Sequence, residues 1–316
     1  MRLTDPANEP GGAPFWGGRR APQREGPFCV DAHGGSWYRL RAMRWMTVLT
    51  LIVAVLAGCA GVPQGAQDLP IFDVHIHYNQ PAWEPYPPDA ALAILDRGGV
   101  SRALVSSTPD DGTLRLYAVA PQRVVPELRP YRSPSDVRSW TKDRAILAYV
   151  EERLKRGIYK GIGEFHLGGG EAGDPVPRAF VDLAAGHGII LHCHCDERAV
   201  EGLVKIRSDA RVLWAHAGMS SPAATVDRLL DRYPNLWVEL AMRWDVAPGG
   251  TLDAAWRALF LKHADRFMVG TDTSENSQWD RLPAILDGFR AWLRQLPADV
   301  AVKIAHGNAE RLFGGP

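Results

Sequence analysis

The stretch that decides the fold is Ile71-Phe72-Asp73-Val74-His75-Ile76-His77. Its apolar residues predict a short buried strand, and successive side chains of a strand point to opposite faces. His75 and His77 are two residues apart, so both imidazoles project from one face. Two neutral imidazoles that converge on one point are half of a site for a divalent metal. The alternative is a polar strand face with no ligand, and this short pattern alone does not decide between the two.

Outward from this stretch, short apolar runs alternate with amphipathic helical stretches, an order that predicts parallel βα units. The length of the segment 68–316 suits an eight-stranded (β/α)8 TIM barrel, which typically has about 250 residues. We expect eight strands, at 71–77, 102–107, 124–131, 161–166, 188–195, 211–216, 236–241 and 266–272. Helical stretches lie between them, for example at 90–96, 143–156, 197–206, 221–233, 252–263 and 279–296, and one at 298–313 closes the chain.

The N-terminal part has a different character. Residues 1–42 are rich in Pro and Gly, which predicts disorder or a segment upstream of the true translation start. Residues 43–58 join a basic start to a short apolar run, as a secretory signal does. The tetrapeptide Leu56-Ala57-Gly58-Cys59 resembles the bacterial lipoprotein signal, so we expect a lipid on Cys59 and a linker at 59–67. This predicts a lipid-anchored protein of the bacterial cell envelope, on the periplasmic face. If translation starts at Met1, the run is instead an uncleaved anchor.

Composition limits the partners. The chain of 316 residues is 46% hydrophobic and 23% charged, which is a globular composition. Beyond residue 58 it carries 29 basic and 32 acidic residues, a net charge of −3. This argues against a nucleic-acid partner and leaves a small-molecule substrate. Cys193 and Cys195 are two apart on an expected strand, a poor geometry for a disulfide, so we expect both thiols to pack against helices.

Ionisable side chains recur at the C-terminal ends of the expected strands. In a β/α barrel these ends meet on one face, where active sites lie. A buried histidine or acid is costly unless it is paired, so a group of them predicts a shared divalent metal, one ion or two, with zinc among the candidates. The six expected ligands are His75, His77, Glu164, His194, His216 and Asp272.

The run His192-Cys193-His194-Cys195 suggests a zinc cluster at first sight. Alternation along a strand places the histidines on one face and the cysteines on the other, so one ion cannot collect all four. His194 is nearer the barrel mouth and is therefore the expected ligand. His192 is expected to lie in a lower layer or to orient a ligand from behind.

These segments resemble the amidohydrolase superfamily, and within it the amidohydrolase-related (amidohydrolase 2) family. The resemblance implies that His75 and His77 are the strand-one ligands and that Asp272 both binds metal and handles the proton of the attacking water. His194 and His216 match the histidines of strands five and six, and Glu164 stands where many members carry a group that bridges two metals. The matching pieces are Phe72–His77, Lys160–Phe165, His194–Asp196, Trp214–Gly218, Val269–Thr273 and Lys303–Phe313.

The expected reaction is hydrolysis of a small ester, lactone or amide. A bound divalent cation lowers the pKa of its water to about 7 and polarises a carbonyl, and Asp272 would serve as the general base. Arg129 and Arg243, near the ends of strands three and seven, are candidates to hold a substrate carboxylate. His166 is either a substrate contact or a support for its neighbours.

Three other functions fit parts of this pattern. Non-oxidative decarboxylation occurs in the same branch, but Glu164 favours hydrolysis because extra negative charge suits a second metal. A metal-dependent barrel nuclease shares the ligand set, yet the net charge and the export signal count against it. A non-catalytic metal-binding surface lipoprotein predicts a lost ligand, and none is lost. The sequence does not give the oligomeric state.

Overall fold

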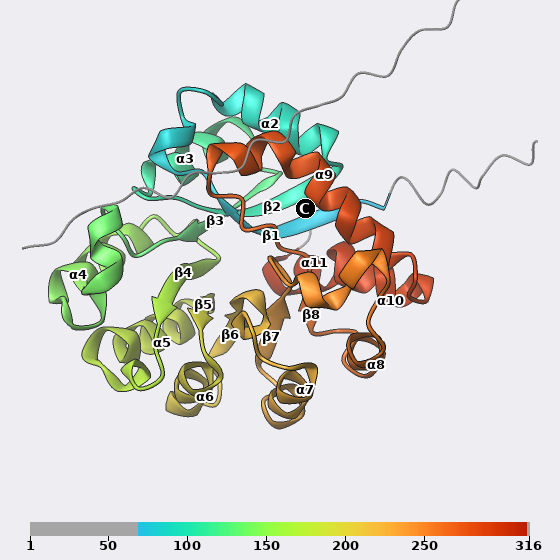
Figure 1. The fold of residues 1–316 in the computed structure, drawn as a ribbon. Coiled ribbons are helices and arrows are strands. Elements are labelled where there is room, and N and C mark those ends of the chain that lie inside the picture. The colour runs from blue at the N-terminus through green and yellow to red at the C-terminus, as the bar shows by residue number, and fades with distance from the viewer. Residues whose placement is uncertain (1–68, 315–316) are drawn as a thin grey trace, which may run out of the picture. The chain divides into compact units, whose positions relative to one another are not determined.

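The computed structural model describes residues 69–314, which form the expected (β/α)8 barrel (Figure 1). Eight strands follow one another around the sheet in chain order, and every neighbouring pair from the first to the last is parallel. The strands are β1 (Ile71–His77), β2 (Val100–Ser106), β3 (Val124–Leu128), β4 (Gly161–Leu167), β5 (Ile190–Cys195), β6 (Arg211–Trp214), β7 (Leu236–Glu239) and β8 (Phe267–Met268).

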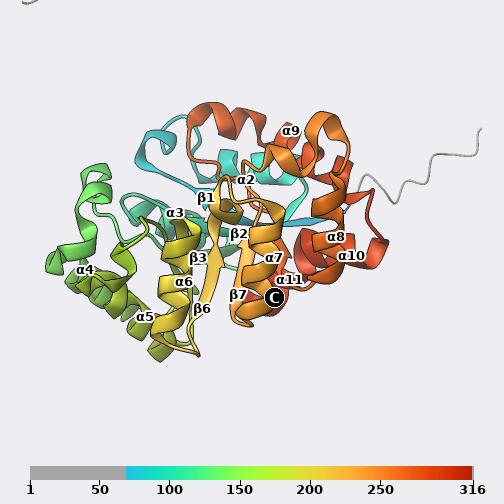
Figure 2. The ribbon, with the colours of Figure 1, turned by 60° about the horizontal axis from the view of Figure 1, so that its bottom comes forward.

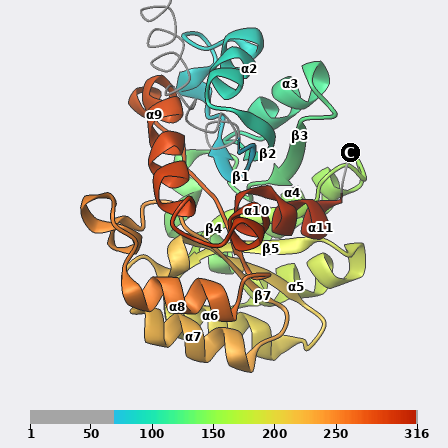
Figure 3. The same cartoon turned by 90° about the vertical axis from the view of Figure 1, so that its right-hand side faces the viewer.

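Helices connect the strands and cover the outside of the sheet, for example α6 and α7 against β6 and β7 (Figure 2). After β8, helix α9 packs beside α2, the helix that follows β1 (Figure 3). The helices are α2 (Pro88–Arg97), α3 (Asp111–Val119), α4 (Arg144–Leu154), α5 (Pro175–His187), α6 (Glu197–Ile206), α7 (Ala223–Arg232), α8 (Ala254–Lys262), α9 (Asn276–Leu293), α10 (Ala298–Val302) and α11 (Asn308–Phe313).

Main-chain contacts between β1 and the segment around β8 bring the two edges of the sheet together. The amide of Val74 donates to the carbonyl of Val269 over 2.9 Å, and the amide of His77 donates to Thr273 over 2.8 Å. The amide of Asp272 donates to the carbonyl of His75 over 2.8 Å. Thr273 and Ile76 also form an isolated parallel β-bridge. The C-terminal ends of β1 and β8 are therefore adjacent at the barrel mouth.

Two apolar layers hold the barrel. The larger layer lies between the strands and the surrounding helices. A smaller cluster combines residues from six strands with two residues of α11, so the last helix packs on the core inside the barrel. Its buried members are Phe72, Val74, Leu104, Val125, Ile190, Leu213, Met268, Ala309 and Phe313. The polar residues of the strands lie further along the chain direction, toward the mouth.

The strand β1 does not alternate strictly. Phe72 and Val74 belong to the smaller cluster, whereas Ile71 and Ile76 belong to the larger one. Between Asp73 and Ile76 the pairing of β1 with β2 shifts register: three steps along β1 match the two steps from Ala103 to Val105, so β1 carries one extra residue there. His75 lies within this interval and His77 just beyond it, and both lie at the mouth.

The structure corrects three expectations. Strand β8 has two residues instead of seven, and helices α3 and α5 were not among the expected helices. Cys193 and Cys195 form a disulfide, so the expectation of no bridge is wrong. Their Cα atoms lie 5.5 Å apart, inside the distance a disulfide spans, and both side chains lie in the outer apolar layer, as the alternation of β5 requires.

The expected signal segment, the linker and Cys59 lie outside the described residues. Within residues 69–314, no helix has both the length and the apolar character needed to cross a bilayer.

Candidate metal centre

Six side chains expected to bind metal converge at the mouth of the barrel, and these six define the candidate metal centre. Two come from the end of β1, one from β4, and one from β5. The other two follow their strands: one lies in the short turn Ala215–Gly218 after β6, and one lies four residues after the end of β8. They are His75, His77, Glu164, His194, His216 and Asp272.

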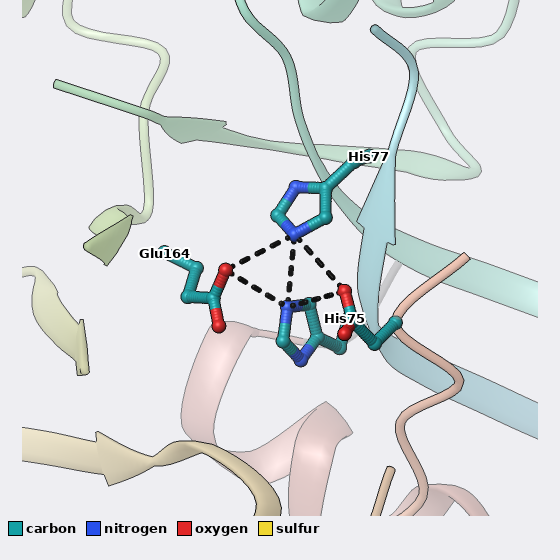
Figure 4. A group of neighbouring side chains, drawn as sticks. His75, His77 and Glu164 are labelled. Carbon is teal, nitrogen blue, oxygen red and sulfur yellow. Dashed lines mark hydrogen bonds and ion pairs between the residues drawn. The ribbon is translucent and has the colours of Figure 1, made fainter. Parts of the chain in front are cut away.

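Four of these groups form a tight cluster. The Nε2 atoms of His75 and His77 lie 3.0 Å apart. The Oε2 atom of Glu164 lies 3.6 Å from His75 Nε2 and 3.3 Å from His77 Nε2, and all three side chains point toward one another (Figure 4). Asp272 Oδ1 is 3.4 and 3.3 Å from the same two nitrogens. One ligand atom from each residue lies within 4.8 Å of all the others.

The second carboxylate oxygen of Glu164 faces the other two histidines. Glu164 Oε1 lies 2.9 Å from Nδ1 of His194 and 3.4 Å from Nε2 of His216. Each oxygen of this one carboxylate therefore serves a different pair of histidines. The second oxygen of Asp272, Oδ2, is 3.9 Å from Nε2 of His216, so Asp272 also touches both pairs.

The hydrogen bonds behind two of the histidines fix their tautomers. Nδ1 of His75 faces the carboxylate of Glu239 at 3.1 Å, and Nδ1 of His216 faces the carbonyl oxygen of Ala241 at 3.2 Å. Both partners can only accept, so each Nδ1 carries a hydrogen, and in the neutral form of each ring, the form that binds a metal, the Nε2 lone pair faces the cluster. Nε2 of His216 is buried and has no hydrogen-bond partner. A cation at this point would satisfy these lone pairs and the two carboxylates together, so the donor set fits a divalent metal.

The electrostatics of the protein alone agree with a site for positive charge. Burial lowers the pKa of His75, but the charges of Asp272 and Glu164 outweigh it and raise that pKa well above its ordinary value. Burial raises the pKa of Asp272, while His75 and His77 lower it to about 2. Burial also raises the pKa of Glu164, but the charge of His75 and the hydrogen bonds of the neighbouring histidines hold it well below its ordinary value. Both carboxylates are therefore ionised at neutral pH, and these buried charges need a cationic partner.

The backbone is strained where it presents two of the donors. His216 has φ 54° and ψ 23°, and Asp272 has φ 50°. A non-glycine residue with positive φ carries a steric cost that the surrounding structure must offset, and such residues gather at functional sites. Glu239 accepts the His216 amide over 2.5 Å, which holds this turn in place.

Sequence reasoning missed Glu239 and Glu127. Glu239 ends β7, is fully buried, and accepts hydrogen bonds from His75, from the His216 amide and, over 2.7 Å, from the Ala241 amide. Burial raises its pKa, but His216 and His75 lower it to about 2. Glu127 on β3 lies 3.2 Å from Nδ1 of His192. Each is an acid in an otherwise apolar strand, and that signal was available in the sequence.

His192 and Asp73 lie behind the ligands. The ring of His192 packs edge-on against His75 at 4.5 Å between centroids and does not reach Glu164, whereas His194 does. Asp73 accepts hydrogen bonds from the His75 amide and, over 2.7 Å, from the hydroxyl of Thr271. It therefore ties β1 to the loop that carries Asp272.

The three expected substrate-binding residues differ in their surroundings. Arg129 donates to the Oε2 atom and the main-chain oxygen of Glu164, both over 3.2 Å. Arg243 is buried and donates to Asp245 twice and to the main-chain oxygens of Ala217 and Ser221. His166 stacks on His194 with ring centroids 4.5 Å apart, and burial lowers its pKa to about 4. Both arginines thus already have carboxylate partners.

Comparison with known proteins agrees with this fold. Residues 133–315 match the family model described as Amidohydrolase. A probable 2-pyrone-4,6-dicarboxylic acid hydrolase from Acinetobacter baumannii is 12% identical over 77% of this chain and 99% of its own, with a TM-score of 0.55. An uncharacterised TIM-barrel protein from Bordetella bronchiseptica is 16% identical over 78% and 87%, with a TM-score of 0.53.

A TatD homologue from Escherichia coli K12 is 18% identical over 78% of this chain and 98% of its own, with a TM-score of 0.52. At these identities the likeness concerns the fold. No curated protein matches the chain. The family match covers more than half of the sequence and includes four of the six residues of the candidate metal centre. The chain therefore belongs to the amidohydrolase family and is an enzyme of the amidohydrolase superfamily.

Proposed function

We propose that the protein is a metal-dependent hydrolase that cleaves a small ester, lactone or amide with two divalent cations, zinc being one suitable metal. The observation that carries this proposal is the placement of Glu164, whose two oxygens face two separate histidine pairs. His75, His77 and Asp272 would hold one cation, and His194 and His216 the other, with Glu164 shared. When bound, such cations polarise a carbonyl group and make a water molecule acidic.

Residues of the chain would transfer the proton and hold the metal ligands in place. Asp272 is ionised and 14% exposed, so its carboxylate can accept a proton from the water that attacks the carbonyl carbon. It then delivers that proton to the leaving oxygen or nitrogen. Arg129 holds the carboxylate of Glu164 in place, and Glu239 orients His75 and His216.

Chelation and re-addition of metal test this function. The full chain is purified, stripped with a chelator, and assayed with phenyl acetate and dihydrocoumarin. We expect hydrolysis to disappear after stripping and to return as zinc or manganese is added, saturating near two equivalents. Hydrolysis that is unchanged in the stripped protein would refute the proposal. Glu164→Gln should lower the number of bound equivalents, while Glu151→Gln, an exposed substitution of the same kind, should not.

We also propose that Cys59 carries the lipid of a bacterial lipoprotein and that the enzyme is anchored in the cell envelope, on the periplasmic face. The support is the order of a basic segment, an apolar run and Leu56-Ala57-Gly58-Cys59 in the sequence.

A further inference from the structure

We propose that His166 is a catalytic residue whose Nε2–H group donates a hydrogen bond to the carbonyl oxygen of the substrate, and that Tyr131 holds the ring in the tautomer that can donate. This inference rests on the proposed hydrolase function. It is carried by the hydrogen bonds around His166 and by the place of its ring in a cavity beside the candidate metal centre.

The ring of His166 lines a cavity of about 420 Å³ that we call the mouth cavity. The mouth cavity is also lined by His194 of the candidate metal centre and by apolar side chains, among them Val137 and Leu167. The rings of His166 and His194 stack with their centroids 4.5 Å apart. A volume of this size suits a small organic molecule, which would contact His166 and the candidate metal centre at the same time.

Tyr131 determines which nitrogen of the His166 ring carries the hydrogen. The Tyr131 hydroxyl accepts the main-chain amide of His166 over 2.8 Å, and it lies 3.4 Å from Nδ1 of the same residue. Tyr131 is fully buried, so its hydroxyl hydrogen needs an acceptor, and within residues 69–314 Nδ1 of His166 is the acceptor available to it. Nδ1 therefore accepts, and the hydrogen of the ring is on Nε2.

This arrangement is the reverse of the one at the expected ligands. Glu164, His166 and His194 lie close enough together to share a cation. A histidine that binds metal needs a lone pair on the nitrogen that faces the ion, and acceptors behind His75 and His216 provide for this. A hydroxyl donor lies behind His166, whose Nε2 has no hydrogen-bond partner among the described residues. His166 therefore offers a hydrogen to the mouth cavity, where a ligand would offer a lone pair.

Three contacts hold His166 in place before a substrate binds. Nε1 of Trp140 donates to the main-chain oxygen of His166 over 2.9 Å. The Tyr131 hydroxyl accepts the main-chain amide, and the ring of His194 lies against the imidazole. A donor that is already oriented needs no reorganisation when negative charge develops on the substrate, which is why such donors are effective in acyl transfer.

The position of His166 also assigns its target. Asp272, the proposed proton acceptor, lies against His75 and His77 at the end of β1, whereas His166 stacks on His194 of β5. Asp272 would carry a proton from the attacking water to the leaving oxygen or nitrogen as its bond to the carbonyl carbon breaks. The carbonyl oxygen is then the atom that a neutral donor can stabilise. His166 would give it a hydrogen bond and keep its own proton throughout.

Nitrogen-15 NMR tests the tautomer without any assay of activity. In a long-range proton–nitrogen spectrum of the zinc-loaded full chain, the signals of His166 are assigned by their loss in His166→Gln. We expect Nε2 to be protonated and Nδ1 to be unprotonated, and we expect Tyr131→Phe to give a mixture of both tautomers. A wild-type ring that is protonated on Nδ1 would overturn the inference.

Kinetics with phenyl acetate test the role in catalysis. His166→Ala should lower kcat by about 10²–10³-fold with little change in KM, because the donor acts on charge that develops during the reaction. His166→Gln keeps an N–H donor and should lose less. The control His187→Ala removes an exposed histidine of α5 and should leave kcat unchanged. Elemental analysis should find as much zinc in His166→Ala as in the wild type, and the loss of an equivalent would overturn the inference by making His166 a ligand.

A double-mutant cycle tests whether Tyr131 acts through His166. Tyr131→Phe should lower kcat by about tenfold in the wild type and have no further effect in His166→Ala. Equal losses in both backgrounds would overturn the positioning role of Tyr131. Thermal unfolding confirms that each variant folds. If the metal-loaded wild type cleaves neither phenyl acetate nor dihydrocoumarin, the hydrolase function itself fails, whereas cleavage that is unchanged in His166→Ala would overturn the inference alone.

Discussion

The carboxylate of Glu239 lies behind the candidate metal centre and fixes histidines that come from two different strands. It accepts the Nδ1 hydrogen of His75, and it accepts the main-chain amide of His216, whose backbone lies in the left-handed region. One buried acid therefore sets both the tautomer of a β1 ligand and the conformation of the turn after β6. Partners of this kind determine how well the ligands are placed for a metal.

We expect Glu239→Gln to weaken zinc binding by about 10–100-fold, because an amide cannot accept hydrogen bonds on both sides as the carboxylate does. Calorimetric titration of the full chain measures the affinity. Glu127→Gln is the matched control, since Glu127 is equally buried but pairs with His192, which is not an expected ligand. Equal losses of zinc affinity in the two variants would argue against a specific role for Glu239.

Asp272 is placed both to hold metal and to accept a proton, and one substitution separates these roles. Asp272→Asn keeps an oxygen that coordinates weakly but cannot accept a proton at neutral pH. We expect turnover to fall by about 10²–10⁴-fold while much of the metal is kept by the four histidines and Glu164. Steady-state kinetics and elemental analysis of the same sample measure both. Near wild-type turnover with full metal would move the search for the base to Glu164 or His166.

At the scale of elements, the sequence predicted the strands best where their pattern was purely local. Strand β1 and helix α6 have the expected bounds, and His75 and His77 share a face as alternation requires. Strand β8 is short because the chain turns away soon after Met268, and Asp272 adopts a positive φ that tertiary contacts impose. Helix α5 begins with Pro175-Val176-Pro177, which disguised its start.

The side-chain partners were less accessible to sequence reasoning. The six expected ligands lie together because the strand ends converge in a barrel. This convergence can be predicted from the order of the strands alone, without any interatomic distance. Arg243 and Asp245 are two residues apart, yet their pairing follows from the shape of the loop after β7. Glu127 and Glu239 could have been noticed in the sequence, because each is an acid in an otherwise apolar strand. Their histidine partners could not be predicted, because those partners come from other strands.

The packing of helix α11 on the barrel core gives a prediction about stability. Phe313 is 5% exposed and packs on Phe72 inside the barrel, with ring centroids 5.8 Å apart. Phe313→Ala should lower the free energy of unfolding by about 3–5 kcal/mol, because it leaves a void in the smaller cluster. Urea unfolding measures the loss, and Val302→Ala, on an exposed face of α10, should cost less than about 0.5 kcal/mol. A loss below 1 kcal/mol for Phe313→Ala would contradict the packing role of α11.

At the scale of the whole molecule, the barrel is layered along its axis. An apolar cluster closed by α11 lies at one end, and acids and histidines follow toward the mouth. The hydrogen bonds and close contacts among these polar residues join β1, β3, β4, β5, β7 and the segment after β8. The site is therefore built on the strands and on the turns that directly follow them, and we expect the loops around it to set which substrate enters.

The proposed lipid anchor gives a prediction about the full-length protein. Labelled palmitate fed to cells that express the full chain should enter the wild-type protein and be lost in Cys59→Ala. The reason is that Cys59 supplies the thiol that the lipoprotein signal Leu56-Ala57-Gly58-Cys59 presents. Cys29→Ala is the matched control and should keep the label. Label that persists in Cys59→Ala would refute the anchor.

The metal content of the purified full chain tests the central claim most directly. Elemental analysis after reconstitution with zinc should give close to two equivalents in the wild type and in His192→Ala, and clearly less in His75→Ala. His192 packs behind His75 without reaching Glu164, whereas Nε2 of His75 faces Glu164, His77 and Asp272. Less than a few tenths of an equivalent in the wild type, or equal losses in the two variants, would contradict the account.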